Sequence, residues 1–154
     1  MFKDISLESQ VERNANVNTT KILNDMPNIT SNAKKYNVAI VGSRTFNDYD
    51  SFKYHINKLF EKYNKKPNEL RIVSGGAIGV DSMARTYANE NKIELLEFLP
   101  DWRKYGRAAG LIRNSDIINS ADWVIAFSQN NSSGTNDSIK KAKTTRKKLD
   151  IIYC

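Results

Sequence analysis

The chain has 154 residues, 40% hydrophobic and 27% charged, with a net charge of +7, which suits one domain with a hydrophobic core better than two. No apolar run approaches the roughly 18 residues of a membrane-spanning helix, and the N-terminus lacks the basic and then apolar order of a secretory signal, so we expect a cytoplasmic protein with no membrane partner. The one cysteine, Cys154, and the one histidine, His55, exclude an internal disulfide and a zinc site of His and Cys, and we expect no metal and no cofactor.

Residues 1–35 are rich in Asn, Ser and Thr and carry only scattered apolar residues. We interpret them as a flexible or loosely docked N-terminal extension, with a short helix near "SLESQVERN". The composition changes at Tyr36, and we therefore place a single folded domain at 36–154.

Short apolar runs then alternate with segments of helical periodicity. The first run, "NVAIVGSR", is continuous, as in a strand buried on both faces, and its apolar part stops at Gly42. A helix is predicted at 47–63, with Asn47 or Asp48 as its N-cap. The strand predicted at 70–74 precedes a helix at 80–91. The apolar stripe of that helix comprises Val80, Met83, Ala84, Tyr87 and Ala88.

The alternation continues to the end of the chain. Strands are predicted at 93–100, 122–128 and 150–154, and helices at 107–121 and 135–148. Right-handed crossovers between parallel strands place each helix against the sheet. The sequence therefore predicts an α/β fold, a Rossmann-like three-layer sandwich with a mainly parallel five-stranded sheet and helices on both faces.

Most of the excess positive charge lies around the last predicted helix. Six basic residues occur in "KKAKTTRKK", at 140–148, and without them the chain is close to neutral. They spread around the helix instead of forming one stripe, which favours a solvated face over a nucleic-acid surface. Nucleic acid is therefore the less favoured partner.

The loops after the first four predicted strands carry most of the glycine and much of the polar chemistry. They read "GSRTFND", "SGGAIGVD", "PDWRKYGR" and "SQNNSSGTND". The carboxyl ends of parallel strands share one edge of a sheet, and open α/β sheets bind ligands there. We expect one binding site at this edge.

Two of these loops have the character of phosphate-binding turns. Gly75, Gly76 and Gly79 allow positive φ angles and a close approach of backbone to ligand, and the N-H groups of the helix that follows suit a phosphate. Gly134 and Thr135 repeat the arrangement at the start of the last helix. The chain lacks both G-x-x-x-x-G-K-[ST] and G-x-G-x-x-G, which argues against a P-loop enzyme and an ordinary dinucleotide dehydrogenase.

Other side chains at this edge leave two interpretations open. Arg44 and Arg113, the latter next to Asn114, either bind phosphate or form surface ion pairs. Trp102 and Tyr105 either stack on a base or cover the core beneath a long loop, and we favour the second slightly.

The acids at the predicted edge also allow two roles. Asp81 and Asp137 lie in the first turns of their helices, where a carboxylate serves as a cap or dipole partner or as a catalytic acid or base. Asp101, after the third strand, could contact a ribose hydroxyl. His55 lies in mid-helix away from the loops, which disfavours a Ser-His-Asp hydrolase.

Four segments together resemble the SLOG superfamily, and within it the small stand-alone YspA-like (cpYpsA-related) proteins of bacteria and phages. They are "VAIVGSRTF", "VSGGAIGVDSMA", "DWRKYGRAAGLIRNSDII" and "SGTNDSIKKA", and the match spans about residues 36–153. The resemblance implies a Rossmann-like domain that binds a nucleotide or a nucleotide-derived ligand. A homodimer is compatible with it, since SLOG relatives often pair.

Relatives in this superfamily have three kinds of function. Some are phosphoribohydrolases that cleave the N-glycosidic bond of a nucleoside monophosphate, some are DprA proteins that bind single-stranded DNA, and some sense ADP-ribose derivatives. The resemblance implies site residues at Gly42, Ser43, Arg44, Ser74, Gly75, Gly76, Gly79, Asp81, Arg113, Asn114, Gly134, Thr135 and Asp137.

One departure bears on catalysis. The phosphoribohydrolases carry P-G-G-x-G-T-x-x-E, whose final Glu is catalytic, whereas this chain has Ser132 and Ser133 at the glycine pair and Ser138 at the Glu position. Asp137 is one residue early and would leave the helix about 100° away from the expected direction.

Three functional hypotheses follow. The first is binding of a nucleoside phosphate or an ADP-ribose-type ligand by a sensor or sequestering protein, with phosphate held at helix N-termini and by Arg44 or Arg113. The second is N-glycosidic hydrolysis in which Asp81 or Asp137 acts. The third is DprA-like binding of single-stranded DNA.

Overall fold

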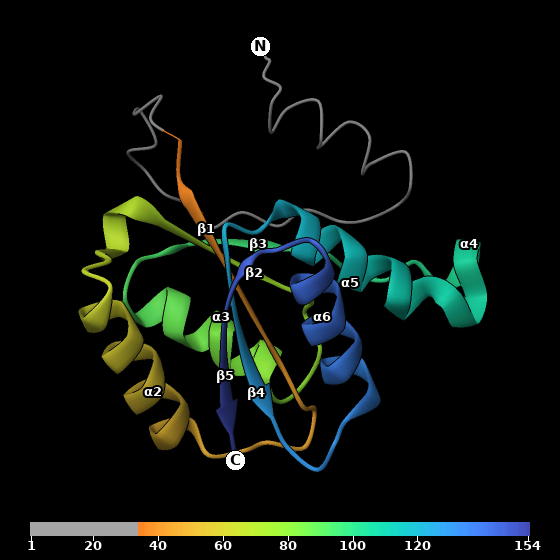
Figure 1. The fold of residues 1–154 in the computed structure, drawn as a ribbon, viewed down its shortest axis with the longest axis horizontal. Coiled ribbons are helices and arrows are strands. Elements are labelled where there is room, and N and C mark those ends of the chain that lie inside the picture. Colours follow the sequence, from red (N-terminus) through yellow and green to blue (C-terminus); the bar gives the residue numbers. More distant parts are fainter. Residues whose placement is uncertain (1–33) are drawn as a thin grey trace.

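The computed structural model describes residues 34–154, which form a sheet with helices on both faces (Figure 1). The short helix expected near "SLESQVERN", and all but the last two residues of the N-terminal extension, lie outside the described residues. In chain order the elements are β1 (Tyr36–Gly42), α2 (Tyr49–Lys62), a 3-10 turn (Pro67–Glu69), β2 (Leu70–Ser74), α3 (Val80–Glu90), β3 (Glu94–Glu97), α4 (Trp102–Tyr105), a second 3-10 turn (Gly106–Ala108), α5 (Ala109–Ser120), β4 (Trp123–Ser128), α6 (Ser133–Thr144) and β5 (Lys148–Tyr153).

The strands are arranged in the order β3-β2-β1-β4-β5, and every neighbouring pair is parallel. This arrangement confirms the predicted Rossmann-like α/β fold. After β3 the chain crosses to the other side of β1 to form β4, so the strand order reverses between β1 and β4. Ligands of open parallel sheets bind outside the carboxyl ends of the strands at such a reversal.

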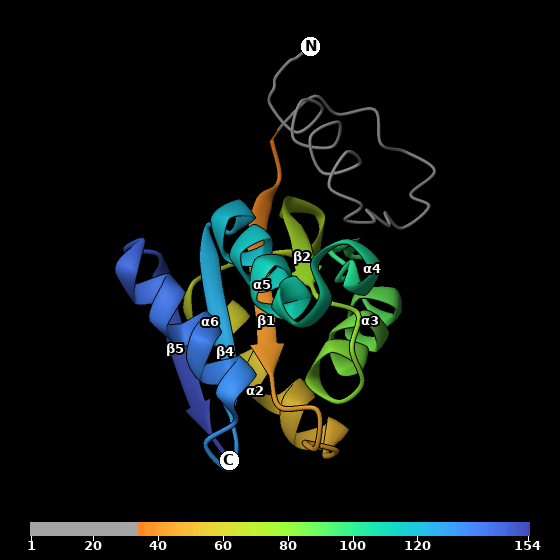
Figure 2. The same cartoon turned by 90° about the vertical axis from the view of Figure 1, so that its right-hand side faces the viewer.

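The helices form two layers, with α2 and α3 on one face of the sheet and α5 and α6 on the other (Figures 1 and 2). In β1, Val38 and Ile40 pack with the first pair of helices, while Ala39 and Val41 pack with the second. All four side chains are buried. A strand between two helical layers has no solvent-facing side, which explains its continuous apolar run.

The predicted helices after β1 and β2 are confirmed. Asp48 caps α2, because its side chain accepts a 3.0 Å hydrogen bond from the Ser51 N–H. The predicted apolar stripe of α3 is buried at every position: Val80, Met83, Ala84, Tyr87 and Ala88. This stripe fixes the face of α3 that packs on the sheet and so the direction in which its N-terminus points.

The predicted end of the last helix is wrong. Helix α6 ends at Thr144, and Lys148 already belongs to β5. Arg146 turns the chain with a left-handed φ of 58°. The ammonium of Lys148 then lies 3.0 Å from the centre of the Tyr63 ring, a tertiary contact that helical periodicity does not encode.

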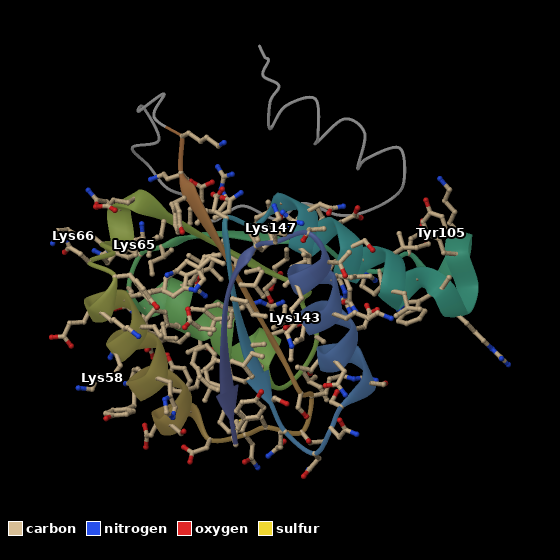
Figure 3. All side chains as sticks on the ribbon, viewed as in Figure 1. Lys58, Lys65, Lys66, Tyr105, Lys143 and Lys147 are labelled. Carbon is tan, nitrogen blue, oxygen red and sulfur yellow. The ribbon has the colours of Figure 1, made fainter. Side chains whose placement is uncertain are left out.

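The prediction also missed a short arm before α5, formed by α4 and the turn that follows it, residues 102–108. Asp101 caps the arm, because its Oδ1 accepts a 3.1 Å hydrogen bond from the N–H of Lys104. Figure 1 shows α4 projecting beyond the sheet, and Figure 3 shows Tyr105 on it. We call residues 102–108 the α4 arm.

Positive charge is spread over both sides of the molecule. Figure 3 shows Lys58 on the side of α2 and Lys143 on the side of α6. Lys147 has a structural contact, because its Nζ donates a 2.8 Å hydrogen bond to the carbonyl oxygen of Ala121, just after α5. A positive charge at a helix C-terminus is attracted to the negative end of the helix dipole and stabilises the helix.

Candidate functional site

A cavity of about 920 Å³ lies at the carboxyl edge of the sheet. Its walls come from the loops after β1, β2 and β4, from the segment between β3 and α4, and from the first turns of α5 and α6. A cavity of this size can hold a nucleotide-sized ligand. The predicted site residues that line it are Gly42, Ser43, Arg44, Gly75, Gly76, Asp81, Arg113, Asn114, Gly134 and Thr135.

Two further predicted site residues lie just behind the cavity wall. Ser74 is fully buried at the end of β2, and its side chain faces the Asp81 carboxyl. Gly79 is the N-cap of α3 with a φ of 78°, and a Cβ there would lie 2.5 Å from the carbonyl oxygen of Ser43. The glycine lets α3 start against the loop after β1, and the Val80 N–H donates to the same carbonyl at 3.2 Å.

Asp137 faces away from the cavity. It lines a separate hollow of about 350 Å³ between α5 and α6. Its Oδ2 lies 2.7 Å from Nζ of Lys141 and accepts a 3.2 Å hydrogen bond from Nδ2 of Asn114. Ser138, the next residue, is buried and lines the large cavity instead. The catalytic role of Asp137 stays a prediction.

Two glycines of the loop after β2 lie close to other side chains of the protein. A Cβ on Gly75 would lie 2.6 Å from Nη1 of Arg113 and 2.9 Å from Oδ2 of Asp81. Gly76 has a φ of 73°, and a Cβ there would lie 2.5 Å from a methyl of Leu99. A Cβ at either position would displace these side chains, and the positive φ of Gly76 by itself favours glycine. Their direct contact with a ligand stays a prediction.

The Asp81 carboxyl, which is buried, and the partly buried Arg113 guanidinium lie on the same side of Gly75 in the loop after β2. Oδ2 of Asp81 accepts a 3.1 Å hydrogen bond from the N–H of Ala77, and Nη1 of Arg113 donates at 2.6 Å to the carbonyl oxygen of Gly75. Burial raises the pKa of Asp81, and the Ala77 N–H and the Arg113 charge oppose this shift. Burial lowers the pKa of Arg113. The Asp81 charge raises this pKa, and the nearby Arg44 charge lowers it.

The N-terminus of α6 opens into the cavity without a side-chain cap. The first N–H groups of a helix have no intrahelical partner. A Cβ on Gly134, in this first turn, would meet nothing within 4 Å. Thr135 is only 3% exposed, and its Oγ1 has no hydrogen-bond partner within the described part of the chain. Free N–H groups, open space and an unpaired buried hydroxyl therefore meet in one turn.

The loop that leads into α6 has an unusual backbone. Asn130 and Asn131 adopt left-handed φ angles of 54° and 53°. Asn tolerates this conformation better than most residues, yet two in succession are uncommon. Nδ2 of Asn136 donates a 2.7 Å hydrogen bond to Oδ1 of Asn131 and ties the loop to the helix. This loop places Asn130 and the α6 N-terminus on the same cavity wall.

Basic side chains outnumber acidic ones around the cavity. The charged residues that line it are three arginines, Arg44, Arg107 and Arg113, and one acid, Asp81. Arg44 is exposed near the start of the loop after β1, which leaves its guanidinium accessible to a ligand. A basic cavity at a sheet edge suits an anionic ligand.

Sequence reasoning missed or misplaced several residues of this region. Arg107 was not predicted, although "YGR" lies in the loop after the third predicted strand. Trp102 is 59% exposed and lines the cavity, so the interpretation that it covers the core is wrong. Asp101 caps α4 and is absent from the cavity wall. His55 packs edge-on against the Phe127 ring, 6.4 Å between centres, and does not line the cavity.

Within residues 34–154 there is no cluster of three or more side chains of the types that ligate metals. In the same part of the chain, no helix combines the length and the apolar character that crossing a membrane requires.

Comparison with known proteins identifies relatives of this domain. Residues 36–105 match the model of the YspA, cpYpsA-related SLOG family. The Gene 61 protein of Mycobacterium phage D29 is 30% identical over 112 residues, which cover 69% of this chain and 87% of that protein.

Two solved structures are similar. DNA processing protein A from Helicobacter pylori, a single-stranded DNA-binding protein, has 25% sequence identity and a TM-score of 0.52 over 75% of this chain. The match spans 64% of that chain, less than two thirds of its length. The protein TM1055 has 16% identity and a TM-score of 0.53, over 74% of this chain and 72% of that one, and shares the fold.

Proposed function

The chain belongs to the YspA, cpYpsA-related SLOG family, and from this premise we propose that it binds a nucleotide-derived small molecule in the cavity at the carboxyl edge of its sheet. The ligand is a nucleoside phosphate or a compound of the ADP-ribose type. The protein acts as its sensor or sequesters it. Three arginines against one aspartate on the cavity wall favour a ligand with negative charge.

The observation that carries this proposal is the first turn of α6. Its N–H groups lack a side-chain cap, Gly134 leaves space before them, and the Thr135 hydroxyl is buried without a partner in the described residues. A buried unpaired hydroxyl is costly, and a phosphate oxygen at this place would accept from both the hydroxyl and the N–H groups. Arg44 is exposed on the wall of the same cavity and supplies a positive charge for the phosphate.

The test is to incubate the purified protein with nucleoside monophosphates, ADP-ribose derivatives and cyclic nucleotides, and to analyse the bound and free fractions by mass spectrometry. We expect one compound to be recovered unaltered after the protein is denatured. The variant Gly134→Asp places a carboxylate where the phosphate is proposed to lie, so it should no longer retain the compound. The variant should still fold, because an acidic residue is favourable at a helix N-terminus. Asn47→Asp adds the same charge just before α2, at an exposed residue outside the cavity wall, and should retain it. Equal retention by both variants would contradict the proposed phosphate site.

Hydrolysis of an N-glycosidic bond is the second candidate, and Asp81 favours it. This carboxyl lines the cavity, and burial raises its pKa, as in many catalytic acids. The same experiment tests it, because free base and a ribose phosphate would appear in the unbound fraction. Asp81→Asn should abolish their formation without loss of binding.

Binding of single-stranded DNA is the third candidate, supported by the similarity to the Helicobacter pylori protein. The spread of basic residues around the last helix disfavoured nucleic acid as a partner. Because of this similarity, that charge distribution alone no longer ranks nucleic acid below a small molecule. DNA binding predicts an affinity that falls steeply with salt concentration, because phosphate contacts release counterions. A flat salt response of a fluorescently labelled oligonucleotide would eliminate this candidate.

A further inference from the structure

The cavity has an apolar side as well as a polar one. Among residues 34–154, five large hydrophobic side chains are exposed, and three of them, Ile78, Trp102 and Leu111, line this cavity. They are 69%, 59% and 52% exposed. Exposed apolar groups that gather in one place mark a surface that a ligand or partner covers.

Trp102 is held in place by its own backbone and by α5. Its carbonyl oxygen accepts the N–H of Gly106, and Asp101 caps the helix that it begins. Its Cη2 lies 3.6 Å from the position that a Cβ on Gly110 would take. The indole therefore rests against the glycine of α5, while more than half of its surface remains accessible.

One face of α5 connects this indole to the polar part of the cavity. Gly110, Arg113 and Ile117 all line the cavity, at the spacing of successive helical turns. Gly110, on which Trp102 rests, and Arg113 are thus about one turn, roughly 5 Å, apart along the helix. The indole and the α6 N-terminus line the same cavity of about 920 Å³.

We propose that Trp102 is the platform on which the aromatic base of the ligand stacks, and that it selects nucleotides over sugar phosphates and inorganic phosphate. This inference rests on the proposed small-molecule function and adds the residue that sets its specificity. The indole face stacks on any base, while Leu111 and Ile78 shield the stack from water. The α6 N-terminus and the arginines suit the anionic end of a ligand, and Trp102 suits its aromatic end.

The test compares adenosine 5′-monophosphate with ribose 5-phosphate, which lacks the base, by isothermal titration calorimetry. We expect the wild-type protein to bind the nucleotide at least about tenfold more tightly. Trp102→Ala should remove most of this difference and leave the ribose 5-phosphate affinity within about twofold, whereas Trp102→Phe should retain much of it. Tyr54→Ala is the matched control, because Tyr54 is equally exposed but lies outside the cavity wall.

Tryptophan fluorescence gives an independent readout. The chain has two tryptophans, and Trp123 is fully buried in β4. Addition of the nucleotide should change the emission of the wild-type protein, while Trp102→Phe, which leaves only Trp123, should show no change.

The outcomes separate this inference from the function on which it rests. If the wild-type protein binds both compounds equally, or if Trp102→Ala weakens both by the same factor, Trp102 is not a base platform, yet the phosphate site stands. If the wild-type protein binds neither these two compounds nor any other phosphorylated compound, both proposals are overturned.

Discussion

The carbonyl oxygen of Gly75 accepts a 2.6 Å hydrogen bond from Nη1 of Arg113, a residue 38 positions later in the chain. The bond joins the loop after β2 to helix α5 across the carboxyl edge of the sheet. Because Gly75 has no side chain, the guanidinium can lie against the loop and beside Asp81. The shape of the cavity wall thus depends on this contact.

Gly75→Ala should therefore destabilise the protein. The new Cβ would lie 2.6 Å from Nη1 of Arg113, and overpacking of a buried site costs about 1–3 kcal/mol. Urea unfolding measures the loss. Gly110→Ala is the control, because its Cβ would make an ordinary 3.6 Å contact with Trp102 and should leave the free energy of unfolding unchanged or slightly higher. Equal stability of both variants would mean that the loop and Arg113 can move apart freely.

Gly134→Ala should have opposite effects on stability and binding. Gly134 lies in the first turn of α6 with no atom within 4 Å of the added Cβ, so alanine should raise the free energy of unfolding by up to about 1 kcal/mol. The same methyl group would project into the open space beside this turn of the cavity wall and should weaken phosphate binding severalfold. Thermal unfolding and calorimetry on one preparation test both parts. Unchanged affinity would place the phosphate elsewhere.

Asp81 should give the protein a stability component that depends on pH. Burial raises its pKa above the ordinary 3.8, so the folded protein binds this proton more tightly than the unfolded chain does. The free energy of unfolding of the wild type, relative to Asp81→Asn, should therefore fall as pH rises from 3.8 through the raised pKa and stay level above it. Urea unfolding of both proteins between pH 4 and 8 measures the difference. A rising difference would show that Arg113 lowers the pKa instead.

Asp137→Ala should change ligand affinity less than about twofold, since Asp137 lines the hollow between α5 and α6 and meets the large cavity only through its 3.2 Å hydrogen bond from Asn114. It should cost about 1 kcal/mol or less of stability, because the lost ion pair with Lys141 is partly exposed and the lost charge is near a helix N-terminus. Calorimetry and urea unfolding measure the two effects. A loss of turnover with intact binding would instead give Asp137 a role in hydrolysis.

The strands and the edge that carries the cavity could be predicted because they depend on local signals. β1 and β4 are buried on both faces and therefore read as continuous apolar runs, and the loops after them hold the glycine and polar residues. The stripe of α3 was predictable for the same reason, as its period matches a helix packed on a sheet.

The missed features depend on tertiary contacts. Helix α4 has only four residues, too few to show a period, and its cap at Asp101 has no distinctive spacing. Trp102 lines the cavity because it rests on Gly110, a contact that the sequence does not display.

The direction of Asp137 was predictable from its position one residue before Ser138, since neighbouring residues in a helix point about 100° apart.

The packing of Gly79 against the backbone of the loop after β1 bears on how sequences of this family are compared. A Cβ on Gly79 would lie 2.5 Å from the Ser43 carbonyl oxygen, a backbone atom, so a relative that no longer holds any ligand would still need this glycine to fold. The pair Gly134 and Thr135 has no such internal reason, because one leaves empty space and the other a hydroxyl without a partner in the described residues. Among homologous sequences, the "SGGAIG" segment therefore indicates membership of the family. The "GT" segment is the better marker of retained ligand binding.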